Sequence, residues 1–220
     1  AGTGFLLGAQ KKPLKVMCGI SGIYGIESRD MFPEACAALG RMTEAIAHRG
    51  PDATGVWTED EELVLGHRRL SIIDTRDVSN QPFRDTVTGD VIVFNGEVYN
   101  YQELREQLKG EFAFKTDSDT EVVLAALQVW GRAALHEFNG MFAFAYWNHA
   151  KRELFIARDR MGIKPLYYTS VNGSVLFSSE VRSLLASNWV KREHDPVAIV
   201  DYLRYQTVHA PRTMVKGVRL

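Results

Sequence analysis

The order of strand-like and helix-like segments constrains the fold of this 220-residue chain more than any single motif does. Short apolar runs typical of strands fall into two groups, and only a few helical patterns are interleaved with them. A doubly wound parallel fold would need strands and helices in regular alternation, which this order lacks. The pattern therefore predicts an α+β fold of two mostly antiparallel sheets, stacked on each other with helices outside.

The individual segments follow from periodicity and from turn residues. Strands are expected over residues 18–25, 56–58, 63–66, 67–74, 91–94, 141–147, 153–157, 166–169 and 175–177. Helices are expected over residues 33–47, 99–109, 122–130, 180–186 and 196–205. Ser118 or Asp119 would serve as the N-cap of the third helix, and capping is the expected role of Asp117 and Glu121.

Charge and cysteine content exclude several classes of protein. Lys and Arg number 26 against 27 Asp and Glu, so electrostatics predict no binding to nucleic acid or to an anionic membrane. Two cysteines without a CxxC pair argue against a disulfide framework and against a zinc site. This cysteine usage fits a reducing compartment, so a cytoplasmic location is expected. Apolar stretches such as residues 140–147 are too short to span a bilayer.

Cys18 is the residue with the clearest chemical potential, and its distance from the amino terminus decides how it can act. A cysteine at the start of a chain has a free α-amine that titrates at about pH 8, so the amine could take the thiol proton. Here residues 1–16 and Met17 precede it. We interpret residues 1–16 as a leader or an artificially added segment, because Met17 directly before Cys18 resembles a natural start.

A thiol that attacks an amide needs hydrogen-bond donors where the oxyanion develops. The Asn95 side chain and the N–H of Gly96, at the expected end of a strand, could provide two such donors. Each feature also has a plainer interpretation, because Asn-Gly is typical of turns and a lone cysteine is typically a small buried residue.

Charged residues extend this constellation. On strand alternation, Arg68 and Arg69 should face opposite sides, one into a pocket and one toward solvent. Arg69 could pair with a carboxylate, while Glu97 and Asp119 could hold an ammonium group. Together these groups would suit an α-amino acid with a side-chain amide, either glutamine or asparagine.

Several motifs in series resemble those of the class II glutamine amidotransferases, and closely resemble the glutaminase domain of glutamine-hydrolysing asparagine synthetases. The resemblance covers the chain from Met17 to its end. The motifs are CGI with GI at 18–23, HRGPD at 48–52, RLSIID at 69–74, NGEVYN at 95–100, SDTE at 118–121, GMFAF at 140–144, RD at 158–159 and GIKPLYY at 162–168.

The resemblance implies an N-terminal-nucleophile hydrolase fold, an αββα sandwich, and the hydrolysis of glutamine to glutamate and ammonia through a γ-glutamyl thioester. It implies the following roles: Cys18 as nucleophile, Asn95 and Gly96 as oxyanion hole, Arg69 as carboxylate clamp, the Leu70 and Ile72 backbone as lining, and Glu97 and Asp119 as contacts to the substrate's amine and polar end. Residues 48–52 and 158–165 are interpreted as structural. His67 is left out as a base, because the α-amine makes it unnecessary.

The resemblance also implies a division of the chain and a partner. Residues 1–16 would be the leader, 17–194 the amidotransferase domain, and 195–220 a helix and the start of a connection to a synthetase domain. That domain would receive the ammonia and would be the place for ATP and magnesium, so no cofactor is expected within this chain. No loop resembling its pyrophosphate-binding motif occurs here. A homodimer is compatible with the pattern.

One departure from the family leaves alternatives open. In the family the nucleophile is the first residue, whereas here the nitrogen of Cys18 is part of a peptide bond and lacks useful basicity. The leading hypothesis is a glutaminase that becomes active when Cys18 is exposed. The alternatives are a non-catalytic glutamine-binding or docking module with a blocked Cys18, and a glutaminase domain that serves a different acceptor.

Overall fold

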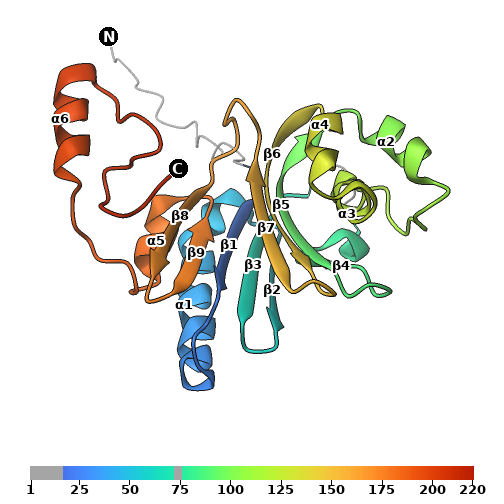
Figure 1. Cartoon of the computed structure of the whole chain (residues 1–220), viewed down its shortest axis with the longest axis horizontal. Coiled ribbons are helices and arrows are strands. Elements are labelled where there is room, and N and C mark those ends of the chain that lie inside the picture. Colours follow the sequence, from blue (N-terminus) through green and yellow to red (C-terminus); the bar gives the residue numbers. More distant parts are fainter. Residues whose placement is uncertain (1–16, 72–75) are drawn as a thin grey trace, which may run out of the picture.

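A computed structural model describes residues 17–71 and 76–220 and shows two antiparallel sheets stacked face to face (Figure 1). The five-stranded sheet has the order β2 (Ala53–Glu59), β3 (Leu63–Arg69), β1 (Gly19–Tyr24), β9 (Ser174–Ser178), β8 (Tyr167–Val171). The four-stranded sheet has the order β4 (Phe83–Arg84), β5 (Val91–Val98), β6 (Gly140–Asn148), β7 (Glu153–Arg158). Every pairing between these strands is antiparallel.

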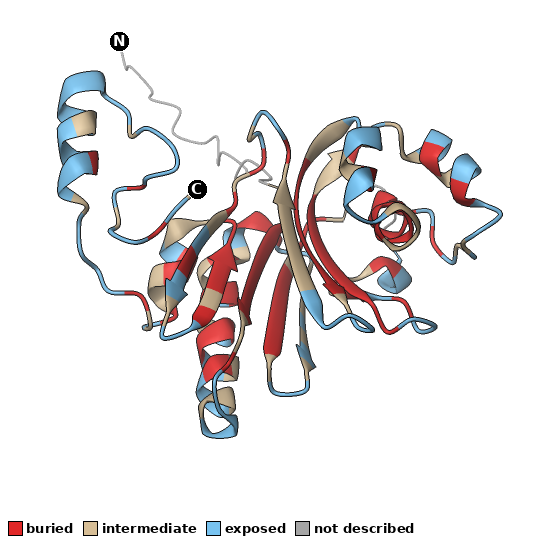
Figure 2. Cartoon of the chain, viewed as in Figure 1, coloured by how far each residue is buried: buried red, intermediate tan, exposed pale blue. Residues whose placement is uncertain are grey.

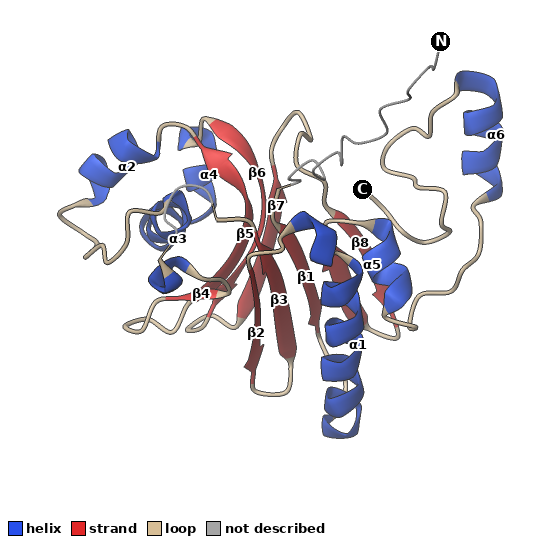
Figure 3. Ribbon diagram, turned by 180° about the vertical axis from the view of Figure 1, so that it is seen from behind, coloured by secondary structure: helices blue, strands red, loops and turns tan. Residues whose placement is uncertain are grey.

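Helices cover the outer face of each sheet, which gives four layers (Figure 3). The five-stranded sheet is covered by α1 (Phe32–Ala45) and α5 (Val181–Ala186). The four-stranded sheet is covered by α2 (Tyr101–Leu108), α3 (Asp119–Trp130) and α4 (Ala134–Glu137). A further helix, α6 (Pro196–Tyr205), stands apart from both sheets. The expected α+β fold and αββα layering are confirmed.

Three apolar cores separate the four layers, and Figure 2 shows the buried residues concentrated in the sheets and on the helix faces that pack against them. The middle core, between the two sheets, contains Trp147 and Phe177, both fully buried. All three cores draw their buried members from residues 20–218. Among the described residues, no buried member of these cores precedes Ile20.

Strand alternation decides which side chains of β3 can meet the other sheet. Leu63 and Leu65 belong to the middle core, whereas Val64 packs under α1. Because successive side chains point to opposite faces, Arg69 shares the inner face and Arg68 the outer one. Arg68 accordingly donates from Nε to the Thr43 carbonyl of α1 at 3.1 Å. The expected split between the two arginines is confirmed, but Arg68 lies against α1, its side chain only 17% exposed, instead of reaching into solvent.

The same alternation operates on β5. Val91 and Val93 belong to the middle core and Ile92 to the outer one, so Asn95 and Glu97 share the inner face. The expectation that this strand stops at residue 94 is wrong: it continues to Val98. Pairing with β6 extends through the Asn-Gly-Glu segment, and this partner strand outweighs the poor strand propensity of asparagine and glycine.

Two further elements lie in segments where neither a strand nor a helix was expected, the short strand β4 and the one-turn helix α4. The expectation of separate strands over residues 63–66 and 67–74 is wrong, because one continuous strand, β3, covers Leu63–Arg69. The other expected helices and strands occur with ends displaced by at most a few residues. Within the described residues, no helix is long and apolar enough to cross a membrane.

Candidate active site

One pocket of about 160 Å³ opens where the inner faces of β3 and β5 meet the start of β1 and of α3. Seven of the eight residues singled out in the sequence line it: Cys18, Arg69, Leu70, Asn95, Gly96, Glu97 and Asp119. The eighth, Ile72, lies outside the described residues. The remaining lining residues are Met17, Ser79, Gln81, Phe94, Ser118, Thr120 and Met141.

The Cys18 thiol sits at the edge of this pocket, against the chain that leaves β3. Its Sγ accepts a hydrogen bond from the Leu70 N–H at 3.3 Å and lies 3.6 Å from the Leu70 carbonyl oxygen. Burial raises the pKa of the thiol, although the Leu70 hydrogen bond and the charge of Arg69 oppose that rise. The thiol is therefore a protonated group at neutral pH that needs a base before it can attack.

His67 does not provide that base. It is fully buried between the sheets, and its Nε2 lies 3.2 Å from the Phe94 carbonyl oxygen. Burial lowers its pKa to about 3, and it is absent from the pocket lining. A neutral His67 that donates from Nε2 to Phe94 links β3 to β5, so it serves to hold the two sheets together.

Asn95 is a fully buried amide at the pocket wall. Neither its Nδ2 nor its Oδ1 has a hydrogen-bond partner among the described residues. An unpaired buried amide is unfavourable by about 1–3 kcal/mol, so native proteins rarely keep one without a functional reason. Here the amide is available to a ligand in the pocket.

Gly96 is fixed by its closeness to β6. A Cβ at this position would lie 2.5 Å from the Met141 carbonyl oxygen and 2.8 Å from the Phe142 Cα. Only glycine lets the two strands approach this closely, so residue 96 keeps β5 against β6 beside Asn95.

Arg69 is buried, and neighbouring chain fixes it in place. Its Nη1 donates to Asn80 Oδ1 at 2.6 Å and to the Arg76 carbonyl oxygen at 3.1 Å. The backbone that follows the Arg69 side chain is held by Asp52, whose N–H donates to the Arg69 carbonyl at 3.1 Å and whose Oδ2 accepts from the Ser71 N–H at 2.8 Å. The HRGPD segment thus supports the wall of the pocket that carries the guanidinium.

Asp119, the first residue of α3, brings a carboxylate to the pocket. Its Oδ2 accepts from the Val98 N–H at 3.1 Å. Burial raises its pKa to about 6, and the charge of Glu97 contributes to the rise. The pocket therefore has a guanidinium on one wall and two carboxyl groups on another.

The expected N-cap is confirmed for Ser118, whose Oγ accepts from the Thr120 N–H at 3.1 Å. The expectation that Asp117 caps the helix is wrong, because Ser118 is the N-cap residue, and the Asp117 carboxylate pairs with Arg76 at 2.8 Å. The Glu121 carboxylate does not bind the N–H groups at the start of α3; it accepts a hydrogen bond from the Thr116 N–H, before the helix, at 2.7 Å. Both carboxylates brace the chain that precedes α3.

A second set of residues holds the chain at Cys18, and sequence reasoning interpreted part of it as merely structural. Arg49, only 6% exposed, donates from Nε to the Cys18 carbonyl at 3.1 Å and from Nη1 to Glu180 at 3.0 Å. The Ile20 N–H donates to Ser179 Oγ at 3.0 Å. Spacing gave no signal for these contacts, because they join segments more than 130 positions apart or depend on which way a buried arginine turns.

The described residues contain no group of three or more His, Cys, Asp or Glu side chains placed to hold a metal ion. The polar groups of the pocket are those of a site for a small zwitterion, with an anion-binding wall, a cation-binding wall and an amide next to a thiol.

The sequence is similar to a known protein family and to several curated proteins. A family model described as a glutamine amidotransferase domain matches residues 17–220. Asparagine synthetase [glutamine-hydrolyzing] 1 of Bacillus subtilis is 42% identical over 205 residues, which are 92% of this chain and 32% of that protein. Asparagine synthetase [glutamine-hydrolyzing] 3 of the same organism is 35% identical over 207 residues, 92% of this chain and 33% of that protein.

The chain thus spans about a third of the length of these curated relatives. Among solved structures, glutamine phosphoribosylpyrophosphate amidotransferase from B. subtilis, complexed with ADP and GMP, superposes with a TM-score of 0.62 at 22% identity. The superposition covers 81% of this chain and 46% of that one, and it supports the same fold.

Proposed function

The chain belongs to the glutamine amidotransferase domain family, in the form found in asparagine-synthetase-like proteins, and we propose that it hydrolyses glutamine by thioester chemistry on Cys18. The observation that carries the proposal is the unpaired, fully buried amide of Asn95 in the pocket that also holds the Cys18 thiol. Glutamate would remain as product, and ammonia would pass to an acceptor.

The proposed reaction begins with the thiol and a free α-amine on Cys18. The amine takes the proton from Sγ, and the thiolate attacks the side-chain amide carbon of glutamine. The carbonyl oxygen becomes an oxyanion, to which the Asn95 Nδ2 and the Gly96 N–H would donate. When the C–N bond breaks, the leaving nitrogen takes the proton from the ammonium of Cys18 and departs as ammonia.

The second half of the cycle removes the γ-glutamyl group. A water molecule gives its proton to the α-amine and adds to the thioester carbonyl, and the same two donors would stabilise the second oxyanion. Breaking the C–S bond releases glutamate, and the thiolate recovers its proton. One residue thus supplies both the nucleophile and the base.

The charged walls of the pocket would orient glutamine for this attack. The guanidinium of Arg69 would pair with the α-carboxylate, while Asp119 and Glu97 would attract the α-ammonium group. The substrate has both charges at one end, so binding this end fixes where the amide at the other end lies.

The test uses a chain that begins at Cys18 and measures the release of glutamate from glutamine. Turnover is expected, and Cys18→Ala should abolish it because the nucleophile is lost. Cys36→Ala is the matched control: Cys36 lies on α1 outside the pocket and should be dispensable. Equal turnover by the Cys18→Ala and unmodified chains would refute the proposal.

A non-catalytic glutamine-binding module is the second candidate, and one observation favours it. Met17 lines the pocket and remains bonded to Cys18, so the nitrogen that should act as base is an amide. Intact-mass analysis of the purified protein, together with calorimetry, separates the candidates. A full-length species that binds glutamine without turnover supports the module, whereas a species that begins at Cys18 supports the enzyme.

The acceptor of the ammonia is proposed from the relatives' names, which specify asparagine synthesis. Their additional length would provide the synthetase domain and the ATP and magnesium it uses. In a longer protein that contains this domain, transfer of the glutamine amide nitrogen to aspartate would support this acceptor, and transfer to another class of acceptor, such as a sugar, would contradict it.

A further inference from the structure

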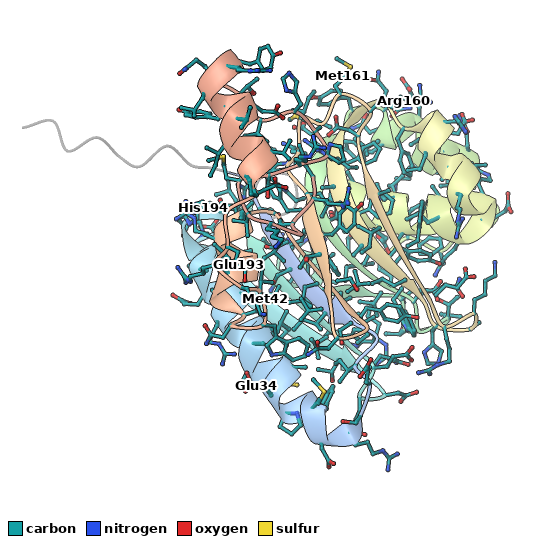
Figure 4. The ribbon with its side chains drawn as sticks, turned by 60° about the vertical axis from the view of Figure 1, so that its left-hand side comes forward. Glu34, Met42, Arg160, Met161, Glu193 and His194 are labelled. Carbon is teal, nitrogen blue, oxygen red and sulfur yellow. The ribbon has the colours of Figure 1, made fainter. Side chains whose placement is uncertain are left out.

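Lys164 is a buried cation that the proposed reaction does not yet use. It lies in the loop after β7 and is only 1% exposed, whereas Met161 in the same loop is 84% exposed. Figure 4 shows Met161 at the outer end of this loop. Its Nζ contacts the Met17 Sδ at 2.6 Å. No carboxylate among the described residues forms an ion pair with it, so this thioether, a weak acceptor, is its recorded partner.

The loop holds Lys164 in a fixed position. Asp159 accepts from the Ile163 N–H and from the Lys164 N–H, both at 2.9 Å. Arg158 donates from Nε to the Lys164 carbonyl oxygen at 2.7 Å. These contacts fix the backbone at Lys164, and the buried side chain ends at the thioether of Met17, the residue before Cys18.

This placement limits the distance between the ammonium and the Cys18 nitrogen. Five covalent bonds separate the Met17 Sδ from that nitrogen, so the Lys164 Nζ lies within about 9 Å of it. Removal of Met17 would take away the partner of Nζ and would expose the Cys18 nitrogen as an amine on the same side.

Several other charged groups, from different elements, affect the titration of Lys164 and Cys18. Burial lowers the pKa of Lys164 and the charge of Arg49 adds to this effect, while Glu97 on β5, Cys18 and Asp159 favour the charged form. Arg69 and Asp119 act on Cys18 from the other side of the pocket. Two cations therefore lie near the backbone of residue 18: Arg49, which is paired with Glu180, and Lys164.

We propose that, once residues 1–17 are removed, the buried ammonium of Lys164 repels a proton from the α-amine of Cys18 and thereby increases the fraction of this amine that is in its basic form at neutral pH. The inference rests on the proposed function, because the amine matters only if it is the base. A unit charge at this distance should lower the pH at which the amine titrates by about 0.3 to 1.4 pH units, for an effective dielectric constant between 80 and 20.

The first experiment measures the amine without requiring catalysis. In chains that begin at residue 18, with serine in place of Cys18, the amine is titrated by its rate of acylation as a function of pH, with the modified terminus identified by mass. Such chains keep all the buried members of the three cores that the described residues contribute. Lys164→Met should raise the titration midpoint by the amount above, and Lys164→Arg, which keeps the charge, should leave it near the original value.

The second experiment measures the acidic limb of the pH profile of kcat/KM for glutamine, in chains that begin at Cys18. Lys164→Met should move this limb to higher pH by the same amount, and Lys164→Arg should not. Lys164→Gln is the second neutral variant, in case Lys164→Met does not fold. Unchanged midpoints in the folded neutral variants would overturn the inference. A moved acylation midpoint without glutaminase activity would uphold the effect on the amine and refute the proposed function.

Discussion

Asn95→Leu should stabilise the domain and at the same time slow the hydrolysis of glutamine. Leucine has the same branched shape as asparagine, with methyl groups in place of the amide oxygen and nitrogen, so it fits the fully buried position with little change in packing. Both polar atoms of Asn95 are unpaired, and removal of one unsatisfied buried group is worth about 1–3 kcal/mol. The free energy of unfolding should rise by that amount.

Such a gain is measurable by thermal unfolding. For a domain of this size, about 1 kcal/mol moves Tm by roughly 2–4 °C, so Asn95→Leu should raise Tm by roughly 2–12 °C. The same variant, in a chain that begins at Cys18, should lose glutamine turnover by about 10²–10³-fold, because one oxyanion donor is gone.

Asn80→Leu is the matched control for the stability effect. Asn80 has the same side chain, but its Oδ1 accepts from Arg69 at 2.6 Å and its Nδ2 donates to Asp77 at 3.2 Å. Leucine there removes satisfied hydrogen bonds and should lower Tm. A fall in Tm for Asn95→Leu as large as that for Asn80→Leu, or undiminished turnover, would refute the reasoning about the unpaired amide.

Two further predictions follow from the walls of the pocket. Burial raises the pKa of Asp119 to about 6, above its unfolded value, so protonated Asp119 stabilises the fold and this contribution is lost as pH rises from about 4 through 6. Asp119→Asn should remove up to about 3 kcal/mol of this pH dependence, measured as the difference between the free energies of urea unfolding at pH 4 and pH 7, and the same difference in the variant and the unmodified chain would contradict the prediction. Gly96→Ala should destabilise the domain by about 1–3 kcal/mol, because its Cβ would lie 2.5 Å from the backbone of β6. Gly40→Ala in α1 is the control and should be neutral or stabilising, because a Cβ there would have no atom within 4 Å; equal Tm values for the two variants would contradict the close approach of β5 and β6.

Local signals were enough to predict most elements of the fold. The helix at 196–205 was predicted with its correct bounds, since Asp195 caps it and a proline occupies its first position. The strand β4 escaped prediction because its two residues carry no local signal and depend on pairing with β5. The end of β5 was missed for the same physical reason, as its partner on β6 is about 45 positions away in the sequence.

For the candidate site, too, the sequence predicts the types of residue but not the contacts between them. The types of residue suggested a thiol, donors and charges, but their convergence depends on contacts such as that between Cys18 and Leu70, 52 positions apart. The cations Arg49 and Lys164 lie in segments whose composition indicates turns, and sequence cannot show that each turns inward toward residue 18. Their effect comes from burial and direction, which are properties of the folded chain.

The pocket lies between two sheets, and each sheet also packs against its own helices. The geometry of the site therefore depends on the position of one sheet relative to the other. Arg69 comes from one sheet and Asn95 from the other, and the outer cores under α1 and α3 do not depend on this junction. A slight separation of the two halves would leave the helices and strands intact and would still pull the two ends of the substrate site apart. Bound glutamine would contact both sheets and stabilise their junction, so the ligand should slow amide hydrogen exchange in strands β3 and β5 more than in the outer helices.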